Sequence, residues 1–557
     1  MRFVGTRPVR LLLAVGTPVL VLLLVSFALQ ASTRPAQAEV RAVAYQPPAP
    51  ANLSIVGAEY SASADIDANQ DAIVVAWTEG NLQTGATNPN GNVELKWKWG
   101  SGDWLRLTVW RYTGSNDKAY DEAVVLRGDV AHLVWVVRSP TSPANYAVYY
   151  LAWNVRLNWC AKQPGLAVDG CREQVSQSNE DAKTQPRVAV DANGVPHVVW
   201  MEQLGGSAWH IFYDNRNGVA WYTPGVGGTD KMISSLGSGQ HLYEYTHPVI
   251  AADDRYVYVA WDLNDRLGTP YCWQDQSGIQ FRLRKAITGT AYAADVAWDP
   301  GVLGQAKRLS VVAGGGCNET LEDGWPTIDV SDHKAYVMWQ HLTDGASLGG
   351  GAYNVYTYTL RYRVLTGANV AQDWWPSADP NLAPDSLPWD VTSLYSDTLE
   401  NAYMSGVRPA LQLTKGQQGI GVHVVWQQWT PPSGGDEPVL VAPYASGQVG
   451  PLAGEGYVTQ DWPYQVLYAS ATYNPPDDLD TVTWITRPIT VPVGRADRIL
   501  CWPDLALASY DGGQSYYLHL AVHRQMSDSG LQNVWYTNLD YFEWTYLPVV
   551  TRRHSRR

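Results

Sequence analysis

The chain repeats one pattern of residues, and this repetition restricts the fold more than any other feature. Residues 186–203, PRVAVDANGVPHVVWMEQ, alternate apolar and polar residues, break at a polar turn, and alternate again up to Trp200. Such a pattern is typical of two strands joined by a tight turn. The same order of proline, alternating strand, polar turn, His or Tyr, and Trp recurs along the chain. The anchor residues of the seven copies are Trp77, Trp135, Trp200, Trp261, Trp339, Trp426 and, in the last copy, Val522.

Most copies are followed by a further stretch rich in Tyr and β-branched residues, such as YTYTLRYRVL at 356–365. A unit of three or four strands cannot bury its faces alone, so many such units stack into a propeller or a solenoid. The anchors are 58 to 96 residues apart, longer than the ~40–50 residues of a compact blade. The sequence therefore predicts an all-β fold, a seven-bladed β-propeller with long inserted loops.

The repeated Trp and His residues are expected to form the core. Residues three apart in a strand face opposite sides, so His132, His197, His423 and His519 point away from the anchor residue that follows each of them, into the packing between blades. We expect them to have a core role in which each holds a hydrogen bond, rather than to ligate a metal. The run from Asp65 to Asp71, DIDANQD, begins like a calcium loop but lacks the glycine at its sixth position, and is interpreted as the turn of the first unit. We expect no metal and no cofactor.

The N-terminus has the order of regions found in export signals. Three arginines precede an apolar run over 11–29, and a small-residue site, Ala36-Gln-Ala38, follows it. Residues 1–38 are therefore predicted to be a signal peptide cleaved after Ala38 or, alternatively, a retained membrane anchor. In either case the protein is expected to be extracellular or at the cell surface. Residues 39–52 are predicted to be a linker, 53–545 the propeller, and 546–557 the end of a closing strand with a basic tail.

Charge and cysteine content restrict the partners and the compartment. The net charge of -14 disfavours nucleic acid as the partner, because phosphate binding requires clustered Lys and Arg. Five cysteines fit an oxidising compartment, with predicted disulfides Cys160–Cys171 and Cys272–Cys317 and with Cys501 left over. A membrane is expected to be contacted only through the N-terminal segment, if it stays uncleaved.

Functional residues are expected on one face of the propeller. The turns between the first and second strands are short (DANG, DDR, SDHK), so the long insertions fall on the opposite face, where binding and catalytic residues concentrate. The insertions after Trp261, after Trp426 and over 366–407 should wall a cleft above the channel. Two sets of side chains are placed at the channel mouth. Those just before each first strand are Gln185, His247, Trp325, Arg408 and Trp502. Those just after each second strand are Glu79, Glu202, Asp262, His341, Gln428 and Arg524.

The repeated hairpin resembles the units of sialidase-like and BNR-repeat propellers over about residues 60–545. The segment 509–516, SYDGGQSY, is close to the Asp-box S-x-D-x-G-x-T-W of that superfamily, although it lies between the first and second strands of its unit. The resemblance implies the fold. Sialidases also need three arginines that grip a carboxylate, and here no Arg-Ile-Pro motif is present, while Arg187, Arg408 and Arg487 lie near strand starts.

Two functions follow. The first is ligand binding on the loop-rich face, with a glycan or an extracellular protein as the partner, since acids, arginines and aromatic rings around a funnel suit a sugar. The content of 26 Trp and 33 Tyr against 5 Phe supports stacking surfaces of this kind. The second is a sialidase-like glycoside hydrolase, with Glu79, Glu202 and Asp262 as candidate catalytic acids.

Overall fold

The structure is a computed structural model, and almost all of its regular structure is β-strand. The residues that it describes are 51–54, 60–80, 91–111, 118–139, 145–176, 181–204, 208–217, 220–221, 231–234, 241–267, 278–285, 298, 307–309, 323–347, 354–366, 389–390, 397–400, 409–416, 419–429, 464–473, 485–489, 497–509, 516–526 and 532–539. Within these ranges no helix is both long and apolar enough to cross a membrane. The predicted signal or anchor, the basic tail, Cys272 and Cys317 lie outside them.

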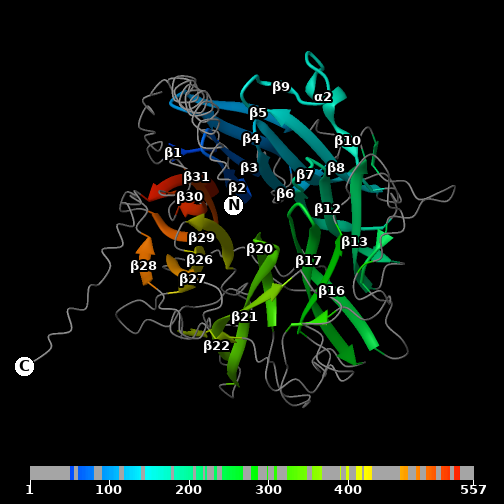
Figure 1. Cartoon of the computed structure of the whole chain (residues 1–557). Coiled ribbons are helices and arrows are strands. Elements are labelled where there is room, and N and C mark those ends of the chain that lie inside the picture. The colour runs from blue at the N-terminus through cyan, green and yellow to red at the C-terminus, as the bar shows by residue number, and fades with distance from the viewer. Residues whose placement is uncertain are drawn as a thin grey trace, which may run out of the picture. The chain divides into compact units, whose positions relative to one another are not determined.

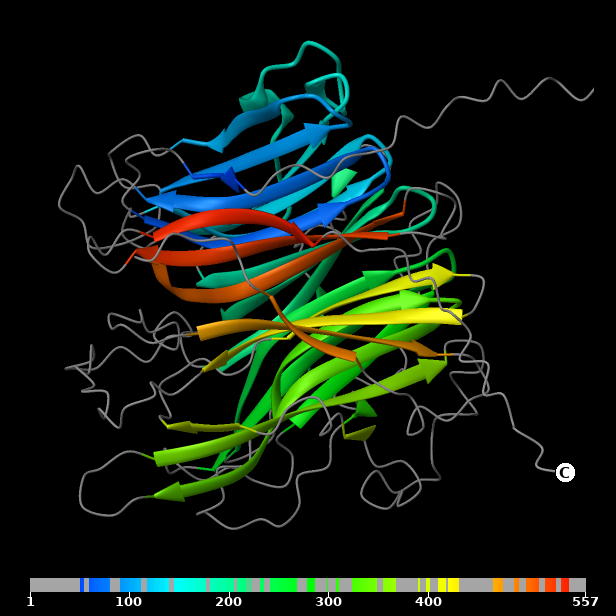
Figure 2. The ribbon, with the colours of Figure 1, turned by 90° about the vertical axis from the view of Figure 1, so that its left-hand side faces the viewer.

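Seven antiparallel sheets of four or five strands surround a central channel, which confirms the predicted seven-bladed β-propeller (Figure 1). The first strand of each repeat is the innermost strand of its blade. Each inner strand packs against the inner strands of the two neighbouring blades, so that the ring is closed: β2 lies between β6 and β29. The strands of the first blade lie beside those of the last in both views (Figure 2).

The first four blades have the following strands, from the channel outward. Blade 1 contains β2 (Tyr60–Ala68), β3 (Ala72–Gly80), β4 (Asn92–Trp99) and β5 (Trp104–Trp110). Blade 2 contains β6 (Lys118–Arg127), β7 (Val130–Ser139), β8 (Asn145–Asn154) and β10 (Glu173–Gln174), and β9 (Trp159–Cys160) also pairs with β8. Blade 3 contains β11 (Lys183–Val190), β12 (Pro196–Leu204), β13 (Ala208–Asn217) and β14 (Ala220–Trp221), and β15 (Lys231–Met232) also pairs with β13. Blade 4 contains β16 (His241–Ala252), β17 (Tyr256–Leu267), β18 (Gly278–Lys285) and β19 (Lys307–Arg308).

The remaining three blades follow the same order. Blade 5 contains β20 (Asp323–Ser331), β21 (Lys334–Ser347), β22 (Asn354–Thr366) and β23 (Trp389–Asp390), and β24 (Asp397–Glu400) also pairs with β22. Blade 6 contains β25 (Ala410–Gly416), β26 (Gly419–Trp429), β27 (Tyr464–Tyr473) and β28 (Ile485–Ile489). Blade 7 contains β29 (Asp497–Ser509), β30 (Tyr516–Met526), β31 (Gln532–Leu539) and, as its outermost strand, β1 (Ala51–Asn52). A short helix, α2 (Val168–Cys171), follows β9.

The N-terminal segment completes the last blade. Ala51 and Asn52 pair with Tyr536 and Trp535 of β31. The Leu53 N–H continues the pairing at 2.9 Å from the Val534 carbonyl, and the Ser54 hydroxyl accepts the Val534 N–H at 2.7 Å. The propeller therefore begins inside the segment that the sequence analysis assigned to a linker, because a two-residue strand carries no alternation that marks it.

The repeated aromatic residues fill the core as expected. All six anchor Trp residues, Trp77, Trp135, Trp200, Trp261, Trp339 and Trp426, have no exposed surface. The four histidines are buried as well, and each bonds the hydroxyl of a Tyr on the third strand of its own blade. The pairs are His132–Tyr150 at 2.6 Å, His197–Tyr213 at 2.7 Å, His423–Tyr468 at 2.7 Å and His519–Tyr536 at 2.8 Å. The predicted structural role of these histidines is confirmed.

The hairpin turns between the first and second strands contact one another around one end of the channel. Asn69 donates to the Gly128 carbonyl, Ala192 to the Asp253 carbonyl, and the Tyr516 hydroxyl to the Lys415 carbonyl. The His333 ring lies 3.1 Å from Asp253, and Lys415 pairs with Asp332. This end of the propeller is thus a set of turns bonded from blade to blade, which holds the ring together.

One predicted disulfide is confirmed. Cys160, in β9, is bonded to Cys171, at the end of α2. The bond ties α2 to the edge of blade 2, next to β10.

Candidate functional site

A β-bulge recurs in the inner strands, and it explains the repeated proline. The ladder between the first and second strands shifts register in six of the seven blades. The residues between the paired positions are 63–64, 121–122, 185–186, 247–248, 325–326 and 502–503. The second bulge residue is proline in four of these six blades. A bulge leaves an extra residue outside the hydrogen-bonded ladder, so proline is tolerated there.

The first residue of the bulge has an unusual backbone conformation in four blades. Asp121, Gln185, His247 and Trp325 have φ angles of 52°, 49°, 48° and 53°. Positive φ is costly for residues other than glycine, by about 1–3 kcal/mol, and such conformations cluster at functional sites. The bulge takes this residue out of the regular alternation of its strand.

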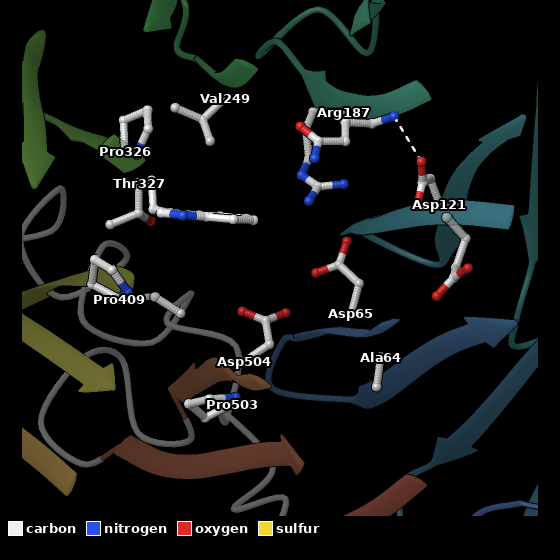
Figure 3. Close-up of a pocket in the computed structure, with 14 residues that line it drawn as sticks. Ala64, Asp65, Asp121, Arg187, Val249, Pro326, Thr327, Pro409, Pro503 and Asp504 are labelled. Carbon is white, nitrogen blue, oxygen red and sulfur yellow. Dashed lines mark hydrogen bonds between the residues drawn. The ribbon is translucent and has the colours of Figure 1, made fainter. Parts of the chain in front are cut away.

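The bulges surround a pocket in the channel, with a volume of about 210 Å³ (Figure 3). Inner strands of all seven blades line it. Its lining residues are Ala64, Asp65, Asp121, Glu122, Gln185, Arg187, Val249, Trp325, Pro326, Thr327, Pro409, Ala410, Pro503 and Asp504. These are the residues at, just before and just after the proline position, so the pocket lies at the end of the channel away from the hairpin turns.

Two carboxyl groups of the pocket are in direct contact. Asp504, on blade 7, is hydrogen-bonded to Asp65, on blade 1. Burial, followed by the charge of Asp65, raises the pKa of Asp504 well above its usual range. Both side chains also accept backbone N–H groups of the next inner strand, Asp504 from Ile66 at 2.9 Å and Asp65 from Val124 at 2.7 Å.

Blade 2 adds two further acids to the same wall. Asp121 accepts the Gln185 N–H at 3.1 Å and the Thr184 hydroxyl. Glu122 accepts the Thr78 hydroxyl through Oε2. Burial raises the pKa of Glu122 well above its usual range.

The residues predicted just before the inner strands lie within those strands, at the first position of the bulge, wherever the structure describes them. Gln185 and Trp325 line the pocket. The His247 ring packs on Trp325 with 3.6 Å between ring centroids. Trp502 occupies the equivalent bulge position, but its side chain is outside the described part, and so is the whole of Arg408, which precedes the pocket residue Pro409.

The three candidate catalytic acids do not line this pocket; each is buried beside a basic side chain. Glu79 is 3.3 Å from Arg106, and Glu202 is 3.2 Å from Lys183, which is itself fully buried. Asp262 accepts a hydrogen bond at 2.8 Å from His247 Nδ1. Of the three, Asp262 contacts His247, whose ring packs on the pocket residue Trp325. The side chains of His341, Gln428 and Arg524 fall outside the described residues.

Sequence reasoning missed Asp65, Asp121, Glu122, Arg187 and Asp504. The signal was available, because each of these residues lies within one position of the repeated proline or of its equivalent. Arg187 lines the pocket, but Arg487 lies on β28, the outermost strand of blade 6. Two of the three arginines considered for a carboxylate grip are therefore far apart in the ring.

A second group of polar side chains lies among the hairpin turns. Asp253, Asp254 and His333 are close enough to hold a metal ion. The His333 Nδ1 atom is 3.1 Å from Asp253 and 3.2 Å from Asp254, so the ring already bridges the turns of blades 4 and 5. Asp253 also accepts the Arg255 and Tyr256 N–H groups of its own turn. These contacts account for the group as a connection between turns.

Comparison with known proteins gives a likeness of fold. No family model matches the chain, and no curated protein matches it. Among solved structures, Trypanosoma rangeli sialidase in complex with sialic acid aligns at 7% identity and a TM-score of 0.37, over 88% of this chain and 57% of that one. Penicillium chrysogenum α-L-arabinanase complexed with arabinobiose aligns at 12% identity and a TM-score of 0.32, over 88% and 99%. An exo-1,5-α-L-arabinanase from a bovine ruminal metagenomic library aligns at 11% identity and a TM-score of 0.29, over 59% and 95%. This chain thus spans little more than half of the sialidase, and its resemblance to sialidase-like propellers is one of fold.

Proposed function

We propose that this protein is an exported binding propeller that takes a glycan into the channel pocket at the bulged ends of its inner strands. The observation that carries the proposal is the repeated bulge. Four residues of different chemistry, Asp121, Gln185, His247 and Trp325, adopt the same costly backbone conformation; three of them line one hollow, and His247 packs on Trp325. A purely structural bulge does not require four different side chains, whereas a ligand site does.

The chemistry of the pocket suits a sugar. Carboxylates and an amide supply hydrogen-bond acceptors, Arg187 supplies donors, and Trp325 supplies an aromatic face. Polar groups that converge in a concave site are the usual basis of small-ligand recognition. A protein surface is the alternative partner, and it would have to present a side chain narrow enough to enter a pocket of about 210 Å³.

A glycan array probed with the purified protein tests the proposal. We expect retention of specific glycans, lost in Trp325→Ala and Gln185→Ala, because both side chains line the pocket. The matched control is Trp159→Ala, which removes an exposed Trp from the outer hairpin of blade 2. Retention that persists in both pocket variants but disappears in the control would place binding elsewhere.

Glycoside hydrolysis is the second candidate function, and the pocket acids favour it less. Glycosidases separate their two carboxyl groups by about 5 to 9.5 Å, to leave room for the sugar or for a water. Asp504 and Asp65 are instead hydrogen-bonded to each other. A panel of chromogenic glycosides decides between the two functions: turnover abolished by Asp504→Asn would favour the hydrolase.

Export is part of the proposal. The Cys160–Cys171 bond fits an oxidising compartment, as does the order of charged and apolar regions in residues 1–38. Sequencing of the N-terminus of the secreted protein would test cleavage after Ala38.

A further inference from the structure

The pocket is asymmetric in charge. Its four acids come from three consecutive blades: Asp504 from blade 7, Asp65 from blade 1, and Asp121 and Glu122 from blade 2. Figure 3 shows Asp504, Asp65 and Asp121 along one side of the hollow. Within the described part of the chain, none of the four forms an ion pair. Their donors are backbone N–H groups, the hydroxyls of Thr78 and Thr184, and the shared proton of the Asp65–Asp504 bond.

The one basic residue in the described lining does not neutralise this wall. Arg187 is on blade 3, and its guanidinium donates to the Pro186 carbonyl at 3.0 Å. Burial raises the pKa of Glu122 well above the usual range, and burial followed by the charge of Asp65 does the same for Asp504. A positive group held at this wall would lower both pKa values.

Two buried acceptor atoms at the pocket have no partner. Gln185 is 7% exposed and Glu122 is 2% exposed, and the Oε1 atom of each lacks a hydrogen bond in the described structure. Buried acceptors without a donor are rare in native proteins, and each such atom needs an explanation. Gln185 is not one of the four acids, so its Oε1 atom is an observation independent of the acidic wall. Both Oε1 atoms could accept a hydrogen bond from a donor group of a ligand.

The opposite wall carries an aromatic ring. Trp325 belongs to blade 5, which is three blades away from blade 1 and from blade 2 around the ring. An ammonium group between carboxylates and an indole face gains both ion pairing and a cation–π interaction. An ammonium group also brings three N–H donors for the unpartnered acceptors.

We propose that the ligand group bound at the acidic wall is a protonated primary amine, and that in a glycan it is the free amino group of an amino sugar such as glucosamine. This inference rests on the proposed glycan-binding function and names the class of sugar. The amine lies nearest the Asp65, Asp504 and Asp121 side of the pocket, away from Arg187.

Two matched sugars test the inference by calorimetric titration of the full-length protein. One is an oligomer of glucosamine, and the other is the N-acetylated oligomer of the same length, which differs only in the charge and bulk at nitrogen. We expect the free amine to bind at least about 10-fold more tightly, since a hydrogen bond to a charged group is worth about one order of magnitude or more in affinity. Added salt should weaken the glucosamine oligomer selectively.

A conservative substitution tests whether the carboxylate of Asp121 binds the amine. Asp121→Asn should lower the affinity for the glucosamine oligomer about 10-fold more than the affinity for the N-acetylated oligomer. Asn tolerates the φ of 52° at this position, and its amide oxygen still accepts from Thr184 and Gln185. Asp254→Asn, which removes an acid that is 59% exposed among the hairpin turns, is the control and should change neither affinity.

The outcomes separate this inference from the proposed function. Equal or tighter binding of the N-acetylated oligomer overturns the inference and leaves glycan binding intact. If neither oligomer binds but other, neutral glycans on the array do, the inference is overturned and glycan binding stands. If the protein binds no glycan on the array, the proposed function itself is overturned.

Discussion

The carboxylate of Asp504 accepts the Ile66 N–H at 2.9 Å, and this bond links the last blade of the ring to the first. The relation recurs between other blades. Asp65 accepts the Val124 N–H, Asp67 accepts that of Leu126, and Asp329 accepts that of Leu413, each at 2.7 Å. The inner strand of a blade is a sheet edge, so its channel-facing N–H groups have no ladder partner. The channel acids supply those partners and hold the blades together, and two of them, Asp65 and Asp504, also line the pocket.

Replacing one of these acids should destabilise the ring. Asp329 accepts N–H groups from Leu413 and Val330, each at 2.7 Å. We expect Asp329→Ala to lower the free energy of unfolding by about 1–3 kcal/mol, the cost of unsatisfied buried groups. Burial raises the pKa of Asp329 to about 6, so the folded protein holds this carboxyl protonated at pH 5. At that pH the substitution removes the hydrogen bonds without also removing a buried charge. An exposed acid of the hairpin turns, in Asp254→Ala, is the control, and equal stability of the two variants would contradict the expectation.

The acid next to the first turn should make stability depend on pH. Burial raises the pKa of Asp67 to about 7 from 3.8. Because the folded state keeps the proton that the unfolded chain loses, the contribution of this group is complete below pH 3.8 and is lost as the pH rises through about 7. Denaturation of the wild type and of Asp67→Asn at pH 5 to 8 checks this.

The advantage of the wild type over Asp67→Asn should shrink as the pH rises. Asp71→Asn, in the same hairpin but exposed, should show a constant difference from the wild type. A difference that stays constant for Asp67→Asn as well would rule out the raised pKa as the cause.

The buried histidines should act in the opposite direction. Burial lowers the pKa of His423 and His519 to about 3 from 6.5. Their contribution is therefore present above pH 6.5 and is lost as the pH falls toward 3. His519→Gln keeps a polar group near the Tyr536 hydroxyl but cannot take up a proton. We expect a shallower loss of stability between pH 6.5 and 4 in this variant, by up to about 1.4 kcal/mol per pH unit; an unchanged slope would show that His519 is not one of the groups that titrate.

The Cys160–Cys171 bond should stabilise the edge of blade 2. It closes a loop with a sequence separation of 11. Replacing both cysteines by Ser should cost about 2–4 kcal/mol, since the unfolded chain regains the freedom of that loop. Peptide mapping without reduction checks the bond directly. The same map tests the predicted Cys272–Cys317 pair, which would appear as free thiols if the pairing is wrong.

The sequence predicts the architecture well because the repeat consists of large residues that are buried in the core. Trp200 and His197 face opposite sides of one strand, and both are buried between blades. The candidate site was harder to predict. Glu79 and Glu202 were expected just after the second strands but lie inside them, where Glu79 pairs with Arg106 of the fourth strand and Glu202 pairs with Lys183, its cross-strand neighbour. The pairing of Glu79 with Arg106 depends on how the strands of the blade pack, which the periodicity does not encode.

Of the residues predicted at the channel mouth, Gln185 and Trp325 line the pocket, whereas the residues just after the proline position were not among those predicted. In a regular strand, Asp504 and Arg187 would be two among many alternating residues. The bulge places both at the pocket, and a bulge is a register shift that no single hairpin reveals. Only the recurrence of proline at the same position in several blades could have indicated the bulge.

The closure of the ring by β1 gives the last prediction. Leu53 is 1% exposed and Ser54 is 5% exposed, and the Ser54 hydroxyl accepts the Val534 N–H at 2.7 Å. A chain that starts at Pro47 retains the strand, whereas a chain that starts at Ile55 leaves the β31 edge and the Val534 N–H without these partners. We therefore expect the first truncation to unfold at the same denaturant concentration as the protein cleaved after Ala38, and the second to unfold earlier and to aggregate through the free edge. Ser54→Ala isolates the side-chain bond and should cost about 1–3 kcal/mol. If the chain starting at Ile55 proves as stable and as monomeric as the longer one, the pairing of β1 with β31 does not close the propeller.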